Sequence, residues 1–227
     1  MKQKKLAAAI DHTLLTATAT ATDIKRLCDE AMKHGFAAVC VNPRWIDVAA
    51  DQLRCSNVQV ATVIGFPLGA DTTKIKVLEA KEAVRCGADE IDMVADLAAI
   101  IEGDQRYLNN QFQAVLKVCQ AMRPAVLLKV ILETAALTEE QKILACQTAQ
   151  QAGVDFIKTS TGLHPAGGAT LEDVRLLKQE APSCRVKAAG GIRTADQAQA
   201  MLDAGADRIG TSAGVAIMTS LDGGTDA

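Results

Sequence analysis

Short aliphatic runs alternate with amphipathic stretches along almost the entire chain. The runs are rich in Val, Ile, Leu and Ala, which is typical of parallel strands buried on both faces, whereas the stretches repeat their apolar residues with a helical period. Strands are predicted at residues 9–13, 37–42, 58–64, 90–94, 126–132, 156–159, 185–188 and 207–211. Helices are predicted at residues 21–33, 73–86, 108–121, 139–152, 171–180 and 195–204.

One short phrase marks several junctions between a helix and a strand. Gly-x-Asp followed by an apolar run occurs at residues 87–89, 153–155 and 205–207. A glycine just beyond a helix can adopt the left-handed conformation that ends it, so each copy predicts a helix-to-strand joint. Helices are expected to start at the capping residues Thr22, Thr138 and Thr194. A supersecondary unit repeated in this way indicates a repetitive fold.

Eight strand–helix units in strict alternation predict an α/β protein of the (β/α)8, or TIM-barrel, class. Such barrels commonly contain about 200–250 residues in one domain, and this chain has 227. We expect the barrel to occupy residues 1–220 and residues 221–227 to form a disordered tail. The alternative, an open doubly wound sheet, is disfavoured because no Gly-x-Gly-x-x-Gly turn follows the first predicted strand.

The charge balance gives no reason to expect a nucleic acid or a membrane as partner. The chain has 24 Lys and Arg against 27 Asp and Glu, and aromatic residues make up only 3%. Its seven cysteines are an odd number without a CxxC pair, which favours reduced thiols in the cytoplasm. The apolar run after the basic start stops at Asp11, and no segment reaches the roughly 20 apolar residues of a membrane span.

Charged residues at the predicted strands are the most informative feature of the sequence. Active sites of such barrels lie at the carboxyl ends of the strands. The candidates within or just beyond strands are Asp11, Asp92, Lys129, Glu133, Lys158 and Lys187. Lysine is rarely buried without a partner, so one such lysine would best be interpreted as a structural ion pair with Asp92 or Glu133. Three lysines in successive strands favour a chemical role.

Amine catalysis explains a cluster of this composition. A free lysine has a pKa of about 10.4, so at neutral pH it is protonated and not nucleophilic. Desolvation and a neighbouring ammonium both disfavour the charged form and can lower the pKa toward roughly 7–8. One nucleophilic lysine, a second lysine that lowers its pKa and a carboxylate that transfers protons together form a complete apparatus for Schiff-base chemistry.

Glycines lie at the carboxyl ends of the last three predicted strands or just beyond them. Gly162 follows the sixth, Gly190 and Gly191 follow the seventh, and Gly210 lies in the eighth. Loops after strands seven and eight are the usual phosphate site of these barrels, because glycine lets backbone N–H groups approach an anion. An ordinary tight turn would explain any one loop, but three adjacent loops favour phosphate. The glycines at 167–168 are interpreted as giving their loop flexibility.

No metal or organic cofactor is predicted. His12, His34 and His164 share no metal-binding motif, and no Walker or dinucleotide-binding motif occurs. Cys40 is expected to line the pocket as a small apolar side chain, because no histidine partner that would activate its thiol is evident.

Eight phrases, in order, resemble the 2-deoxy-D-ribose-5-phosphate aldolase family along nearly the whole chain. They are IDHTLL at 10–15, CVNPRW at 40–45, VIGFPLGA at 63–70, GADEIDMV at 87–94, LKVILETAALTEE at 128–140, FIKTSTG at 156–162, VKAAGGIRT at 186–194 and GADRIGTSAGVAIM at 205–218. Even without the other phrases, FIKTSTG followed by VKAAGGIR would be a strong indication of this family.

The resemblance implies a cofactor-free class I aldolase, often dimeric or tetrameric. Members reversibly cleave 2-deoxy-D-ribose 5-phosphate to D-glyceraldehyde 3-phosphate and acetaldehyde, in deoxyribose phosphate catabolism. By resemblance, Lys158 forms the imine, Lys187 lowers its pKa and relays protons, and Asp92 donates and accepts protons. Lys129 and Asp11 resemble supporting residues of the substrate pocket. Phosphate binding is implied for Gly162, Gly190, Gly191, Arg193, Gly210 and Ser212.

The chain departs from the family in two places. Residues 163–166 carry a His-Pro where many members have a shorter segment with Ser or Thr, and the tail lacks a tyrosine that aids proton transfer in some members. Two other functions stay open: a barrel isomerase or different aldolase acting on another phosphorylated sugar, and a catalytically silent sensor of sugar phosphates. A sensor would need the phosphate glycines but not the set of Lys158, Lys187 and Asp92. An isomerase that uses only acid–base catalysis would leave no borohydride-reduced adduct.

Overall fold

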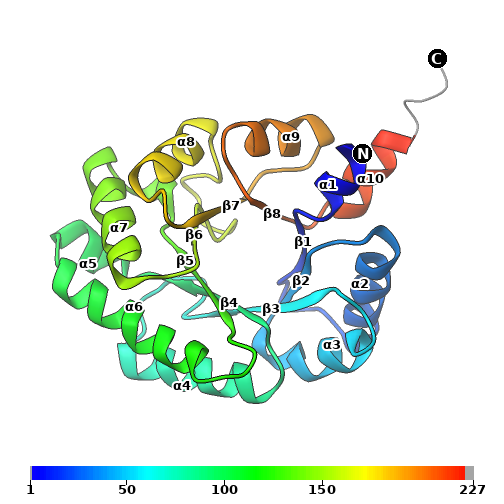
Figure 1. The fold of residues 1–227 in the computed structure, drawn as a ribbon, viewed down its shortest axis with the longest axis horizontal. Coiled ribbons are helices and arrows are strands. Elements are labelled where there is room, and N and C mark those ends of the chain that lie inside the picture. The colour runs from blue at the N-terminus through cyan, green and yellow to red at the C-terminus, as the bar shows by residue number, and fades with distance from the viewer. Residues whose placement is uncertain (1, 223–227) are drawn as a thin grey trace.

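Eight parallel strands close into a single barrel at the centre of the molecule (Figure 1). The structure is a computed structural model that describes residues 2–222. The strands pair in chain order, and β8 returns to pair with β1. Their bounds are β1 Ile10–Leu14, β2 Ala38–Val41, β3 Gln59–Ile64, β4 Glu90–Val94, β5 Leu127–Ile131, β6 Phe156–Lys158, β7 Arg185–Ala189 and β8 Arg208–Thr211. This confirms the predicted (β/α)8 class and excludes the open doubly wound sheet.

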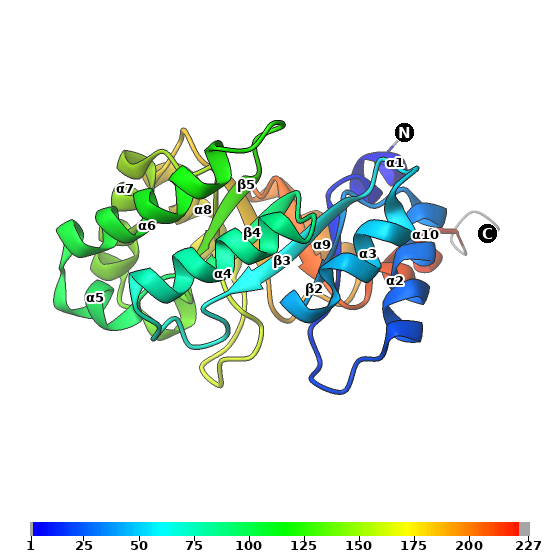
Figure 2. The same ribbon diagram turned by 90° about the horizontal axis from the view of Figure 1, so that it is seen from below.

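Helices form a ring outside the barrel, with α2 and α3 at one side and α5 and α6 at the other (Figure 2). Their bounds are α1 Lys2–Ala7, α2 Ala21–His34, α3 Ile46–Leu53, α4 Thr73–Arg85, α5 Leu97–Glu102, α6 Gln105–Gln120, α7 Glu139–Ala152, α8 Leu171–Glu180, α9 Ala195–Asp203 and α10 Gly214–Asp222. None of the helices described is both long and apolar enough to cross a bilayer.

Six of these helices were predicted, and α1, α3, α5 and α10 were not. The first three are short, with six to eight residues each, and offer too few turns for a clear helical period. The helix α10 continues to Asp222 and so includes the first two residues of the expected tail; residues 223–227 lie outside the described part of the chain.

The predicted helix starts are correct at two of three positions. Thr138 and Thr194 cap α7 and α9, each in a reciprocal capping box with the glutamine three residues on. Thr22 is not a cap. The cap of α2 is Thr20, whose hydroxyl accepts the Asp23 N–H at 3.3 Å while the Asp23 carboxylate accepts the Thr20 N–H at 3.0 Å. The box requires a side chain that can accept a hydrogen bond three positions after the cap, and the residue three positions after Thr22 is Lys25.

The aspartates of the repeated Gly-x-Asp phrase have one shared role. Each carboxylate accepts a hydrogen bond from a backbone N–H near the start of the neighbouring strand. The bonds join Asp89 to Val60, Asp155 to Leu128 and Asp207 to Val186, at 2.8, 2.9 and 2.8 Å. The repeat therefore fastens the amino end of one strand to the joint that precedes the next.

Replacing Asp155 with alanine is expected to lower the free energy of unfolding by about 1–3 kcal/mol. The substitution leaves the Leu128 N–H, a partly buried donor, without the carboxylate that now accepts it. Denaturant unfolding of the variant beside Asp51→Ala, which removes an exposed carboxylate, measures the effect. Equal stability of the two variants would show that water replaces Asp155 at this joint.

The interior of the barrel has two unlike walls. On β2 and β3 the inward-facing residues are small and apolar, and Ala38, Cys40, Ala61 and Val63 form a cluster of their own. The other six strands direct charged side chains inward, because side chains alternate between the two faces of a strand. The site described next occupies this charged wall.

Candidate active site

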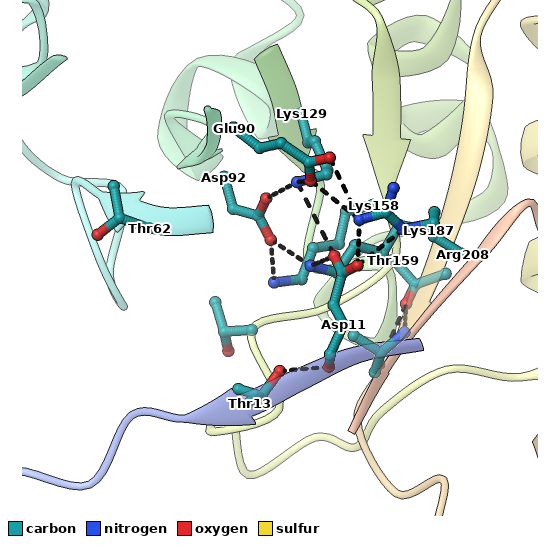
Figure 3. Close-up of polar contacts among 12 residues, drawn as sticks. Asp11, Thr13, Thr62, Glu90, Asp92, Lys129, Lys158, Thr159, Lys187 and Arg208 are labelled. Atoms are coloured by element: carbon teal, nitrogen blue, oxygen red, sulfur yellow. Dashed lines mark hydrogen bonds and ion pairs between the residues drawn. The ribbon is translucent and has the colours of Figure 1, made fainter. Parts of the chain in front are cut away.

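Seven charged side chains meet inside the barrel, and we call them the buried ion cluster (Figure 3). Its members are Asp11 of β1, Glu90 and Asp92 of β4, Lys129 of β5, Lys158 of β6, Lys187 of β7 and Arg208 of β8. The strand register brings them together, because Asp92 lies beside Lys129 and Lys158 beside Lys187 in adjacent strands. Sequence positions as far apart as 11 and 208 thus contribute to one site.

Asp92 is the centre of the cluster. Its Oδ1 accepts a hydrogen bond from Lys129 Nζ at 2.7 Å, and its Oδ2 accepts bonds from Lys158 Nζ at 2.9 Å and Lys187 Nζ at 2.7 Å. Burial alone would raise the pKa of the Asp92 carboxyl, but the three ammonium groups, that of Lys129 foremost, hold this pKa well below its usual range. Asp92 is therefore ionised, and the amines of Lys158 and Lys187 share one of its oxygens.

Lys187 is held by a second carboxylate, since its Nζ lies 2.5 Å from Asp11 Oδ2. Burial lowers the pKa of the Lys187 amine, but the charges of Asp11 and Asp92 outweigh burial and raise it. Burial likewise raises the pKa of Asp11, yet the charges of Lys187, Arg208 and Lys129 bring it down to about 2. Lys187 is therefore protonated at neutral pH and places a positive charge beside Lys158.

Glu90 and Arg208 complete the cluster from below, and sequence reasoning missed both as site residues. Glu90 Oε2 lies 2.5 Å from Lys129 Nζ. Arg208 donates from Nε to Asp11 Oδ1 at 2.7 Å, from Nη2 to the same oxygen, and from Nη2 to Glu90 Oε2 at 3.1 Å. A usable signal was present: Glu90 precedes Asp92 by two residues, and Arg208 precedes Gly210 by two, so each shares the inward face of its strand.

An aromatic ring lies at the floor of the cluster. Phe156 of β6 is buried, and its ring centroid lies 5.9 Å from Lys129 Nζ and 6.0 Å from Arg208 Cζ. Arg185, at the start of β7, stacks its guanidinium 4.0 Å from the same centroid. The cluster therefore packs against an apolar ring whose faces attract cations through cation–π interactions.

A cavity of about 460 Å³ lies above the cluster, at the carboxyl ends of β1, β6, β7 and β8. It is lined by Thr13, Leu14, Leu15, Thr16, Lys158, Thr161, Gly162, Leu163, Ala189, Gly190, Gly191, Ile192, Arg193, Gly210, Thr211 and Ser212. Of the seven members of the cluster, Lys158 alone lines it. The amine at position 158 is therefore the one that a molecule in the cavity can reach.

The six residues expected to bind phosphate all line this cavity, on the side of β6 to β8. Their glycines allow a tight fit between loops. A Cβ at Gly190, where φ is +94°, would lie 2.9 Å from Gly168 Cα, and one at Gly168 would lie 2.3 Å from the Gly190 oxygen. The interpretation of Gly168 as a source of flexibility is therefore wrong; it lets the loop after β6 pack against the loop after β7.

Two other candidates lie apart from the cavity lining. Cys40 is buried in the apolar wall, and burial raises the pKa of its thiol, so it stays neutral. Glu133 follows β5 with a left-handed backbone, φ 57°, and its carboxylate accepts the Thr161 N–H at 3.2 Å. The lysines pair instead with Asp11, Glu90 and Asp92.

Fold and site together define a barrel enzyme with a reachable lysine amine at the foot of a glycine-lined cavity. The model of the DeoC/LacD family aldolases matches residues 5–220, and the chain belongs to this family, a family of lyases. A deoxyribose-phosphate aldolase from Thermococcus kodakarensis is 52% identical over 221 residues, covering 96% of this chain and 97% of the relative. One from Streptococcus gordonii is 51% identical, covering 94% and 96%.

Solved structures agree with this assignment. A tetrameric deoxyribose phosphate aldolase from Aeropyrum pernix has a TM-score of 0.89 and 32% identity, covering 96% of this chain and 92% of that one. An aldolase designated QR15 has the same TM-score with 40% identity, covering 96% of each chain.

Proposed function

We propose that this enzyme reversibly cleaves 2-deoxy-D-ribose 5-phosphate to D-glyceraldehyde 3-phosphate and acetaldehyde through a Schiff base on Lys158. The observation that carries the proposal is the position of this amine. It lines the cavity, whereas Asp92, which contacts it, and Lys187, its neighbour on the adjacent strand, are buried beneath. The names of the relatives support this choice of substrate.

The nucleophile is the neutral amine of Lys158. It attacks C1 of the open-chain aldehyde, and the carbinolamine loses water to give the imine. Asp92, as an ionised carboxylate 2.9 Å from this amine, accepts the proton that the amine loses and returns it to the departing hydroxyl. Lys187 stays protonated, which disfavours a second positive charge on its neighbour.

Protonated on its nitrogen, the imine then serves as the electron sink for cleavage, and the proton taken up here is released when the final imine is hydrolysed. The C3 hydroxyl loses its proton, the C2–C3 bond breaks, and the bonding pair forms an enamine on Lys158 while C3 becomes the aldehyde of glyceraldehyde 3-phosphate. Protonation of the enamine at C2 and hydrolysis of the resulting imine release acetaldehyde. Atoms balance, because the water lost on imine formation is regained at this hydrolysis.

The phosphate is placed at the other end of the cavity, against Gly162, Gly190, Gly191, Gly210 and Ser212. Backbone N–H groups of glycine-rich turns bind anions without needing net positive charge nearby. Arg193, exposed at the rim, adds the attraction of a cation. The distance between the glycine loops and Lys158 then fixes which carbon of the sugar meets the amine.

Replacing Gly190 with alanine is expected to raise KM for 2-deoxyribose 5-phosphate about tenfold or more, because a Cβ there forces the loops apart. Turnover of unphosphorylated 2-deoxyribose should change much less. Steady-state kinetics on both sugars measure the difference. Gly35→Ala is the control, since Gly35 also has positive φ but a Cβ added there would meet no atom within 4 Å. An equal loss on both sugars would contradict phosphate binding by this loop.

The reaction class is tested by reductive trapping of the wild-type enzyme. Incubation with acetaldehyde and borohydride should leave one ethyl group on the Lys158 amine, seen as a mass increase of the intact protein and located by peptide mapping. An enzyme that uses only acid–base catalysis, such as an isomerase, gives no adduct. A sensor gives neither adduct nor turnover.

We also propose a homo-oligomeric, dimeric or tetrameric, cytoplasmic enzyme. The tetrameric assembly of the Aeropyrum pernix relative supports the first point. The second is supported by the seven cysteines, which are all free thiols. Light scattering of the purified protein measures the assembly.

A further inference from the structure

The buried ion cluster contains unequal numbers of acidic and basic groups. Its acids are Asp11, Glu90 and Asp92, and its bases are Lys129, Lys158, Lys187 and Arg208. With all seven ionised, the cluster carries one net positive charge. With Lys158 neutral and the rest ionised, three cations face three anions. Net charge in a buried site is costly, so the cluster as a whole favours the neutral form of this one amine.

The contacts show that Lys158 is the cation of the cluster with the fewest carboxylate partners. Lys129 lies between Glu90 and Asp92 at 2.5 and 2.7 Å, and Lys187 lies between Asp11 and Asp92 at 2.5 and 2.7 Å. Arg208 bridges Asp11 and Glu90. Each of these cations has two carboxylates close by, whereas Lys158 contacts a carboxylate oxygen that Lys187 already occupies.

We propose that Glu90 and Arg208 are positioning residues that set the protonation of Lys158 from beneath, by fixing the charge of the cluster. This inference rests on the proposed Schiff-base role of Lys158. Neither residue lines the cavity, so neither meets the substrate there. Glu90 acts through Lys129, whose Nζ lies 2.5 Å from its carboxylate. Arg208 acts through Asp11, to which its guanidinium donates two hydrogen bonds.

Other polar groups around Lys158 do not change this charge count. On β2 the Cys40 thiol stays neutral, because burial raises its pKa. Glu133, after β5, accepts the Thr161 N–H and forms no ion pair with the seven described residues of the cluster. Arg185 stacks on the Phe156 ring and is exposed. The charged group that contacts the Lys158 amine is the Asp92 carboxylate of β4. That carboxylate also binds Lys129 and Lys187, and Lys129 in turn lies near Asp11.

Two isolated charge changes should shift the pH at which Lys158 reacts, in opposite directions. Glu90→Gln removes an anion, so protonating Lys158 becomes harder and the midpoint of its reaction moves to lower pH. Arg208→Gln removes a cation and moves the midpoint to higher pH. For unit charges several ångströms apart at an effective dielectric constant of about 20, each shift should be about one to two pH units. The double variant restores the balance and should react near the wild-type midpoint.

The experiment measures reductive ethylation of the Lys158 peptide against pH, beside the pH profile of kcat/KM, for the wild type, E90Q, R208Q and the double variant. The pH dependence of the reagent is common to all four and cancels. Labelling of wild-type Lys158 comes first; its absence refutes the proposed function. If wild-type Lys158 is labelled, the charge inference is overturned when the pH midpoints of E90Q and R208Q shift in the same direction or do not shift. A merely structural role would lower the activity of both variants without moving their midpoints in opposite directions. If R208Q does not fold, the comparison of E90Q with the double variant still tests the inference. The pH midpoint of E90Q should move to lower pH, whereas that of the double variant should stay near the wild-type value.

Discussion

An enzyme with Lys158 replaced by leucine is expected to form no reduced adduct with acetaldehyde and borohydride, and to lose activity by roughly 10³-fold or more. Leucine keeps the apolar stem of the side chain but removes the amine that lines the cavity. No other amine of the cluster can take over, because Lys129 and Lys187 are each held by two buried carboxylates. Intact-protein mass and initial rates of cleavage measure the two effects.

The control for this experiment is Lys25→Leu, which removes an exposed lysine of α2. It should label and turn over like the wild type. Continued labelling of the Lys158→Leu enzyme, mapped to Lys187 or Lys129, would show that the nucleophile has been assigned to the wrong strand.

The second large effect is expected at Asp92. Its replacement by asparagine leaves the buried ammonium groups of Lys129 and Lys187 beside a neutral amide, so the free energy of unfolding should fall by about 3–5 kcal/mol. Loss of the proton acceptor should also reduce kcat/KM by roughly 10²–10⁴-fold. Denaturant unfolding and steady-state kinetics measure the two losses separately.

Asp51→Asn is the matched control, because Asp51 is an exposed acid paired with Arg54 on α3, where little stability depends on the charge. If Asp92→Asn remained as stable as this control, Lys129 and Lys187 would have to be neutral or solvated in the folded protein. That result would contradict the charged cluster on which the mechanism is built.

The barrel was predictable from the sequence because its signal is local. β4, α7 and α8 have the predicted bounds, and the other predicted elements differ by a few residues at their ends. Buried parallel strands must be aliphatic, so Lys129 and Lys158 stood out against their neighbours. The repeated Gly-x-Asp phrase marked the joints, although its role in holding neighbouring strands became clear only with the hydrogen bonds of Asp89, Asp155 and Asp207.

Asp92 was one of two carboxylates predicted to pair with the lysines, and the structure confirms it. The other partnerships within the cluster were not predictable, because they depend on register across the closed barrel. Arg208 follows an aspartate at the start of a strand and looks like an ordinary surface residue, yet closure of β8 on β1 places it against Asp11. Glu133 was an equally good candidate partner in sequence, but it follows β5 with a left-handed backbone and holds Thr161 instead. Pairing across distant strands leaves no local trace.

The buried Phe156 ring beneath the charged cluster has a consequence for the order in which the two products leave the enzyme. Phe156 and six of the seven cluster residues are buried or do not line the cavity, so the proposed reaction uses the opening of the cavity on the side of the glycine loops. The phosphorylated three-carbon fragment, nearer that opening, must depart before water can reach the carbon still bonded to Lys158. Release is therefore sequential, and an excess of the larger aldehyde should slow the liberation of the smaller one.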